Sequence, residues 1–113
     1  MVSVQSSISD HIFLRSGTTY SRVALSDVLY IEADGNYAHL QAVQGRFAVK
    51  RSLASIDESL NNTSFIRVSR GVIVNFTHVS SVSFADGTIS MGDRTLKMGK
   101  AYFTDVRSHM PRL

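Results

Sequence analysis

The segment Phe65–Asn75, FIRVSRGVIVN, sets basic and hydroxyl side chains within an apolar run. Because its apolar residues should be buried, the backbone is expected to be rigid and to hold Arg67, Ser69 and Arg70 at fixed points. Arginine donates paired hydrogen bonds to a guanine edge or a phosphate, and serine can donate to a phosphate. This chemistry suits contact with DNA. For Arg67 alone, alternation along a strand favours a solvent-facing side chain whose stem lies on apolar surface.

Further basic residues flank two expected helices. Lys50 and Arg51 precede the first, Lys97 precedes the second, and Arg107 lies near the end of the second. Together with Arg67 they are candidate phosphate anchors, which hold a protein on DNA without reading its sequence. Solvated surface charge is the alternative interpretation for each of them.

The net charge of +3 is unevenly distributed along the chain. Residues 1–45 hold two Lys or Arg against four Asp or Glu, whereas residues 46–113 hold ten against five. Such an excess of positive charge attracts a polyanion, but it does not identify one.

Signatures of catalysis and of metal binding are missing from the sequence. The chain has no cysteine, and no glycine-x-serine-x-glycine, P-loop or G-x-G-x-x-G motif occurs. Its histidines are too widely separated for zinc-ligand spacing. They are His11, His39, His78 and His109. We therefore expect no enzymatic activity, no cofactor and no structural metal.

The composition is typical of one globular domain. The chain has 113 residues, of which 43% are hydrophobic and 19% charged, and no apolar run is long enough to span a bilayer. We expect residues 1–10 to be a tail or the remnant of a linker, and residues 11–110 to form the domain. Because the start of the chain lacks signal-peptide features, the expected compartment is the cytoplasm, without membrane contact.

Short runs of β-branched and aromatic residues, separated by turn residues, predict a mainly β protein. The first half is typical of an antiparallel meander, and Asp86-Gly87 marks a tight hairpin in the second half. The predicted strands are 11–15, 20–25, 28–33, 37–43, 46–50, 65–68, 71–74, 79–84, 88–91 and 94–98.

Two short helices are also predicted. The first has Ser52 as its N-cap and Asn61-Asn62 as its stop, and the second covers residues 100–109 and stops before Pro111. The residues at helical spacing are Leu53, Ile56 and Leu60 in the first helix, and Ala101, Tyr102, Val106 and His109 in the second.

Asn75 and most aromatic residues are interpreted as structural. An amide at the end of an apolar run is expected to tie loop backbone. Aromatic residues at alternating positions should fill the core instead of forming a platform for stacked bases. These core aromatics are Tyr30, Phe47, Phe65, Phe76, Phe84 and Phe103.

Four ordered segments, YIEADGNY, RSL, FIRVSRGVIVN and TLKMGKAYF, resemble the LytTR DNA-binding domain over about residues 11–110. The resemblance implies an elongated arrangement of small antiparallel β-sheets with two short helices. It also implies that loops, in place of a recognition helix, enter successive major grooves of DNA.

The resemblance implies three contact regions. The first is Asp34–His39, where Asn36, Tyr37 and His39 could reach bases or phosphates. The alternative interpretation is that Asp34-Gly35-Asn36 is only a turn. The second is Ser69-Arg70-Gly71, where relatives often have His-Arg-Ser, so only the arginine is retained. In the third, Gly99–Tyr102, Lys100 stands where relatives have arginine, which weakens the case for guanine reading and favours a phosphate contact. The base-reading candidates of the three regions are Asn36, Tyr37, His39, Ser69, Arg70 and Lys100.

The expected function is sequence-specific binding of double-stranded promoter DNA, with two copies on repeated sites. The chain would be the output domain of a bacterial transcription regulator, with a receiver domain or a sensor kinase upstream, or a stand-alone regulator. The alternative is a protein-interaction or dimerisation β module with an incidental basic face. Binding of single-stranded RNA ranks lower, because it would need exposed aromatics for stacking.

Overall fold

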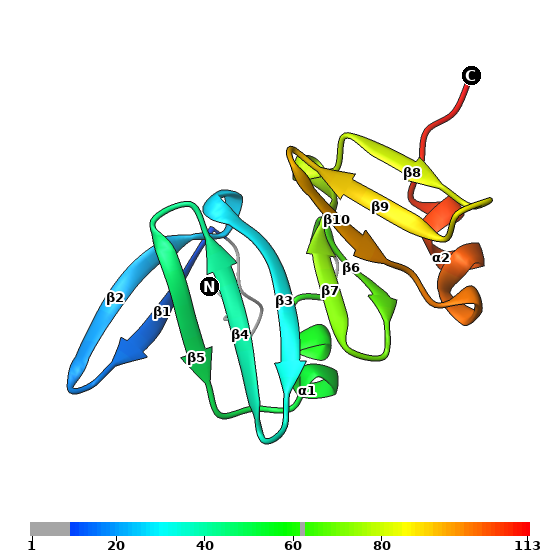
Figure 1. The fold of residues 1–113 in the computed structure, drawn as a ribbon. Coiled ribbons are helices and arrows are strands. Elements are labelled where there is room, and N and C mark those ends of the chain that lie inside the picture. The colour runs from blue at the N-terminus through cyan, green and yellow to red at the C-terminus, as the bar shows by residue number, and fades with distance from the viewer. Residues whose placement is uncertain (1–9, 62) are drawn as a thin grey trace, which may run out of the picture.

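Three separate antiparallel sheets make up the described part of the chain, which is residues 10–61 and 63–113 of a computed structural model (Figure 1). The molecule measures 44 × 34 × 23 Å along its principal axes. The prediction of an elongated, mainly β fold with two short helices is confirmed. The expected tail at residues 1–10, apart from Asp10, and Asn62 of the expected helix stop lie outside the described residues.

The first sheet is a hairpin of β1 (His11–Ser16) and β2 (Thr19–Ala24). Gly17 in its turn has a φ of 64°, a conformation that costs glycine little. Leu14 and Val23 point inward and are buried, and β1 packs beside β5.

The second sheet has five strands in the order β5-β4-β3-β7-β6. It joins the two halves of the chain, because β3 pairs with β4 on one side and with β7 on the other. The predicted meander is therefore divided: the β1–β2 hairpin forms a sheet of its own, and β3 gains a neighbour from the second half. The strands are β3 (Val28–Asp34), β4 (Tyr37–Ala42), β5 (Gly45–Val49), β6 (Phe65–Ser69) and β7 (Val72–Asn75).

The third sheet is a meander of β8 (Ser81–Ser83), β9 (Thr88–Met91) and β10 (Arg94–Lys97). Asp86-Gly87 lies in the turn between β8 and β9, and the φ of Gly87 is 68°. The hairpin predicted there is confirmed.

Helix α1 (Leu53–Ser59) begins as predicted, because the Ser52 hydroxyl accepts a hydrogen bond from the backbone N–H of Ser55 at 3.1 Å. Single 3₁₀ turns, η1 (Leu25–Asp27) and η2 (Phe76–His78), follow β2 and β7.

The second predicted helix is divided into a 3₁₀ turn, η3 (Lys100–Tyr102), and α2 (Phe103–Ser108). The apolar face predicted for it was partly wrong, since Ala101 and His109 are exposed. A 3₁₀ turn advances further around the axis per residue than an α-helix, so the buried side shifts. The residues of this region that pack on the core are Phe103, Val106 and Met110.

Two hydrophobic cores lie on opposite faces of the five-stranded sheet. Ile31 and Ile73 enter the first core, beneath the β1–β2 hairpin and α1. Tyr30 and Val74 enter the second, against the three-stranded sheet and α2. The alternation of neighbouring residues in β3 and β7 therefore supplies both cores from one sheet.

The predicted core aromatics do pack in these cores. Tyr30 and Phe65 are buried, and the other four are partly buried. Phe84 and Phe103 meet edge to face, with ring centroids 5.2 Å apart.

Asn75 is structural, as predicted, and only 1% exposed. Its Nδ2 donates to the carbonyl oxygens of Leu25 and Val28 at 3.2 and 2.9 Å. Its Oδ1 accepts from the Ser64 hydroxyl at 2.7 Å and from both the hydroxyl and the backbone N–H of Thr77 at 2.8 and 3.2 Å. This network ties η1 and η2 to β7.

Candidate nucleic-acid interface

One end of the five-stranded sheet brings together segments that are far apart in the sequence. The β3–β4 turn lies beside the end of β5, because Ala38 pairs with Val49. The β6–β7 turn adjoins β3, where the Ala33 N–H donates to the carbonyl oxygen of Gly71 at 2.8 Å. These turns lie along the lower side of the molecule in Figure 1. The first and second predicted contact regions therefore share one end of one sheet.

The β3–β4 turn presents Asn36 and Tyr37 to solvent. Gly35 has a φ of 60°, which fits the two-residue turn between strands paired at Asp34 and Tyr37. Asn36 is exposed, and Tyr37 is 46% exposed even though it belongs to β4. Both predicted base-reading residues are accessible from outside.

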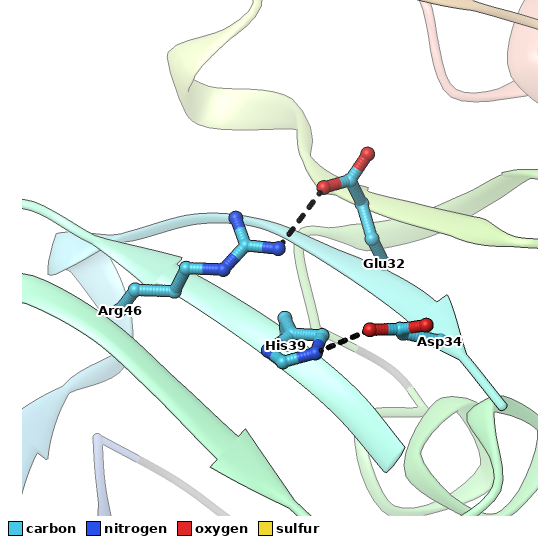
Figure 2. Close-up of polar contacts among 4 residues, drawn as sticks. All are labelled: Glu32, Asp34, His39 and Arg46. Atoms are coloured by element: carbon cyan, nitrogen blue, oxygen red, sulfur yellow. Dashed lines mark hydrogen bonds and ion pairs between the residues drawn. The ribbon is translucent and has the colours of Figure 1, made fainter. Parts of the chain in front are cut away.

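His39 lies on the face of the sheet next to the turn, and not at the tip of the turn. Its Nε2 is 2.9 Å from an Asp34 carboxylate oxygen, and its side chain is 22% exposed (Figure 2). Beside it, the carboxylate of Glu32 lies 3.7 Å from the Arg46 guanidinium. Asp34 therefore orients the imidazole and engages one of its two ring nitrogens.

The β6–β7 turn carries Ser69 and an exposed Arg70. A register shift between Arg67 and Ser69 marks a bulge, a feature that re-aims side chains at strand ends. The Arg67 guanidinium donates to the carbonyl oxygens of Arg70 at 2.6 Å and Ser69 at 3.3 Å. Arg67 therefore stabilises the turn in which Arg70 is exposed.

The third predicted region adjoins the second. The Gly99 N–H donates to the carbonyl oxygen of Val68 at 2.8 Å, and a Cβ on Gly99 would lie 3.8 Å from the Cα of Ser69. The same Cβ would lie 3.2 Å from the Tyr102 ring, so this close approach suits glycine. Lys100 follows directly and is exposed, and η3, which begins at Lys100, packs against β6.

The remaining phosphate candidates differ in their surroundings. Lys50, at the end of β5, and Lys97, on β10, are exposed. The guanidinium of Arg51 donates to the hydroxyls of Ser55 and Ser59 and to the Ser55 carbonyl oxygen, at 2.8–3.1 Å, which ties it to α1. The guanidinium of Arg107 lies 4.2 Å from the centroid of the Phe84 ring. Both arginines thus have structural contacts besides any contact with DNA.

Sequence reasoning did not single out two residues of the hairpin, Arg15 and Tyr20. They pair across β1 and β2 and line a groove of about 330 Å³ with Tyr37 and Lys50. The available signal was the alternation along β1, which sets Arg15 on the face opposite the buried Leu14.

Among residues 10–61 and 63–113, no cluster of three or more His, Asp or Glu side chains is placed to hold a metal ion. No helix in these ranges has the length and apolar character needed to cross a membrane.

The family model described as the LytTr DNA-binding domain matches residues 18–110. The CO-responsive transcriptional regulator RcoM of Rhodospirillum rubrum is 35% identical to this chain over 63 residues. That match covers 56% of this chain and 27% of the regulator, so it spans about a quarter of the relative.

A solved structure shares the fold. It is the LytTr DNA-binding domain of a protein described as a methyl-accepting/DNA response regulator from Bacillus cereus. The TM-score is 0.76 at 25% sequence identity, and the match covers 88% of this chain and 95% of the solved one.

Proposed function

The chain belongs to the LytTR DNA-binding domain family, and we propose that it recognises specific double-stranded promoter sequences through loops that enter the major groove. The family consists of DNA-binding domains of transcription regulators and not of enzymes, so DNA is its partner. The proposal of sequence recognition through loops rests on one observation. The exposed Asn36, Arg70 and Lys100 all project from turns, and these turns lie at or beside one end of a rigid sheet.

Each turn offers a donor suited to a base edge or a phosphate. Asn36 can pair with adenine through its amide, and Arg70 can pair with guanine O6 and N7 through its guanidinium. Lys100 carries a point charge that fits a phosphate or a single guanine acceptor. Tyr37, His39 and Ser69 stand beside these donors and add hydrogen-bonding groups at the same surface.

Affinity that does not depend on sequence would come from phosphate contacts. Lys50 and Lys97 are exposed, so their ammonium groups are accessible to phosphates. Arg51, Arg67 and Arg107 keep unused N–H donors besides their internal contacts, so they add positive potential around the turns.

We infer that two copies bind repeated sites, because two linked contacts raise the affinity of a small domain on one duplex. The relatives are a CO-responsive transcriptional regulator and a response regulator, which indicates different inputs for one output module. We propose the output role for this chain as well, with a receiver domain or a sensor kinase of a two-component pathway upstream.

Selection from a random duplex library, followed by titration, tests this proposal. The selected duplex, a scrambled duplex and single-stranded RNA are each titrated at low and at physiological salt. We expect preference for the selected duplex to persist at physiological salt. Weak binding that is lost equally for all three would contradict sequence-specific binding. Self-association unaffected by DNA or salt would then favour the alternative protein-interaction module.

A further inference from the structure

The outward face of the β1–β2 hairpin carries aromatic and basic side chains together. Phe13 and Tyr20 are 59% and 61% exposed, which is uncommon for side chains of this size. Phe13 pairs across the strands with Arg22, and Tyr20 pairs with Arg15. The Arg22 guanidinium carbon lies 5.4 Å from the centroid of the Phe13 ring, a cation–π contact that engages it within the hairpin.

A groove separates this hairpin from the β3–β4 turn and the end of β5. Phe13, Arg15 and Tyr20 form one wall, and Tyr37 and Lys50 belong to the other. Two cations and two phenol hydroxyls therefore line it, and its lining contains no carboxylate. Such a surface complements an anion with adjacent apolar parts.

We propose that this groove holds the sugar–phosphate backbone of duplex DNA that flanks the base-reading site. Arg15 and Lys50 contact phosphates, and the Tyr20 and Tyr37 rings cover the sugars while their hydroxyls donate to phosphate oxygens. The inference rests on the proposed function. The proposal extends the interface from the sheet end to the β1–β2 hairpin. This hairpin lies on the left of Figure 1, and its turn faces the same lower side as the β3–β4 turn.

Continuity favours DNA as the occupant. Tyr37 and Lys50 belong both to the groove and to the sheet end with its candidate contact turns. A duplex bound at those turns would thus continue past the hairpin.

The excess of acidic residues in the first 45 positions gave no indication of the basic groove at the hairpin. Their four carboxylates outnumber their two arginines. In the structure, however, the carboxylate of Glu32 lies 3.7 Å from the Arg46 guanidinium, and that of Asp34 lies 2.9 Å from His39 Nε2. Among residues 10–61 and 63–113, the ion pairs within 4.0 Å include neither Arg15 nor Arg22.

Variants of the hairpin and a series of duplex lengths test the proposal. Duplexes carrying the selected site are shortened from one flank and then from the other. We expect Arg15→Ala to weaken binding of the long duplex about fivefold and to lower the slope of log K against log salt by about 1. Shortening the flank on the hairpin side should abolish that difference. Arg15→Lys should restore most of the affinity, because a phosphate contact needs charge more than a planar fork.

Arg22→Ala is the matched control, since Arg22 shares the exposed face but does not line the groove. It should change binding less than twofold. Equal thermal midpoints for all variants would show that the hairpin stays folded, and Tyr20→Phe, which removes only the hydroxyl, supplies a milder second variant.

The outcomes separate the two proposals. If the wild-type chain prefers no duplex, the proposed function fails and the inference fails with it. If specific binding persists while Arg15→Ala equals wild type at every length, only the inference is overturned. It is also overturned if the hairpin variants alter self-association instead of DNA binding, or if single-stranded DNA binds more tightly than duplex in a Tyr20-dependent way.

Discussion

At the scale of single residues, side chains of the same type have different roles because their neighbours differ. Arg70 is exposed at the tip of a turn, whereas the Arg67 guanidinium, three positions earlier, is bonded to backbone carbonyls. Asn36 is exposed in a turn, whereas Asn75 is buried and fully bonded. The residue type therefore sets the available chemistry, and the local contacts decide whether the side chain faces solvent or packs within the fold.

Replacing Arg70 should affect specificity, whereas replacing Lys50 should not. Arg70→Ala is expected to lose about 1–3 kcal/mol of discrimination at one base pair of the selected site. Lys50→Ala should weaken all duplexes alike and lower the salt slope by about 1. Titrations against the selected site and its single-base variants measure both effects. The base-reading role of Arg70 is wrong if the two variants act alike on every sequence.

Asn75→Ala should destabilise the fold without touching the candidate interface. The change leaves the carbonyl oxygens of Leu25 and Val28 without their donor and opens a small cavity. We expect a loss of about 3 kcal/mol in the free energy of unfolding. Urea denaturation measures the loss, with Asn61→Ala, at an exposed site, as the control. A loss no larger than that of the control would contradict the structural role.

At the scale of elements, each candidate contact segment is positioned by a contact to a neighbouring element. Arg67 braces the β6–β7 turn, and the hydrogen bond from the Gly99 N–H to Val68 holds the start of η3 against β6. The β3–β4 turn is a two-residue connection between fully paired strands. Rigid strands thus present short turns, which reduces the ordering cost of binding.

Arg67 is expected to act on DNA binding through the β6–β7 turn. Arg67→Ala removes two hydrogen bonds to the turn, so the Ala33 amide, which is bonded to Gly71, should exchange faster with solvent and binding should weaken. Arg67→Lys keeps the charge but loses the planar fork. It should therefore fail to restore affinity if positioning is the main role.

Hydrogen exchange and titration of the same proteins check this prediction. Arg94→Ala is a suitable control, because the Arg94 guanidinium lies 5.1 Å from the centroid of the Tyr30 ring and away from the turn. Full rescue by Arg67→Lys, with unchanged exchange at Ala33, would instead support a direct phosphate contact.

At the scale of the whole molecule, one sheet joins two cores. Ile73 and Val74 are neighbours in β7, and each is fully buried in a different core. Loss of one core would therefore expose one face of the strands whose opposite face forms the second core. This arrangement favours a single cooperative unfolding transition.

Ile73→Ala in the first core and Ile89→Ala in the second should each lower the stability of the entire domain. Both side chains are fully buried, so each change should cost about 2–5 kcal/mol. Backbone amide signals from both cores, followed during urea denaturation, should disappear at one shared midpoint in each variant. Separate midpoints for the two cores would contradict a cooperative domain.

Features that depend only on neighbouring residues could be predicted from the amino-acid sequence. Strand alternation around Tyr30 and Ile31, the turn at Asp86-Gly87 and the Ser52 cap are local, so pattern and residue type predict them. The ordered segments around Arg70 also identified the family.

Contacts between segments that are far apart in the sequence could not be predicted and are seen only in the folded chain. Pairing of β3 with β7 and division of the strands into three sheets depend on contacts across long stretches of chain, which no local pattern specifies. For the same reason, sequence reasoning did not reveal that Arg51 and Arg67 have internal partners. Nor could it find the groove shared by Arg15 and Lys50, because folding alone brings β1 beside β5.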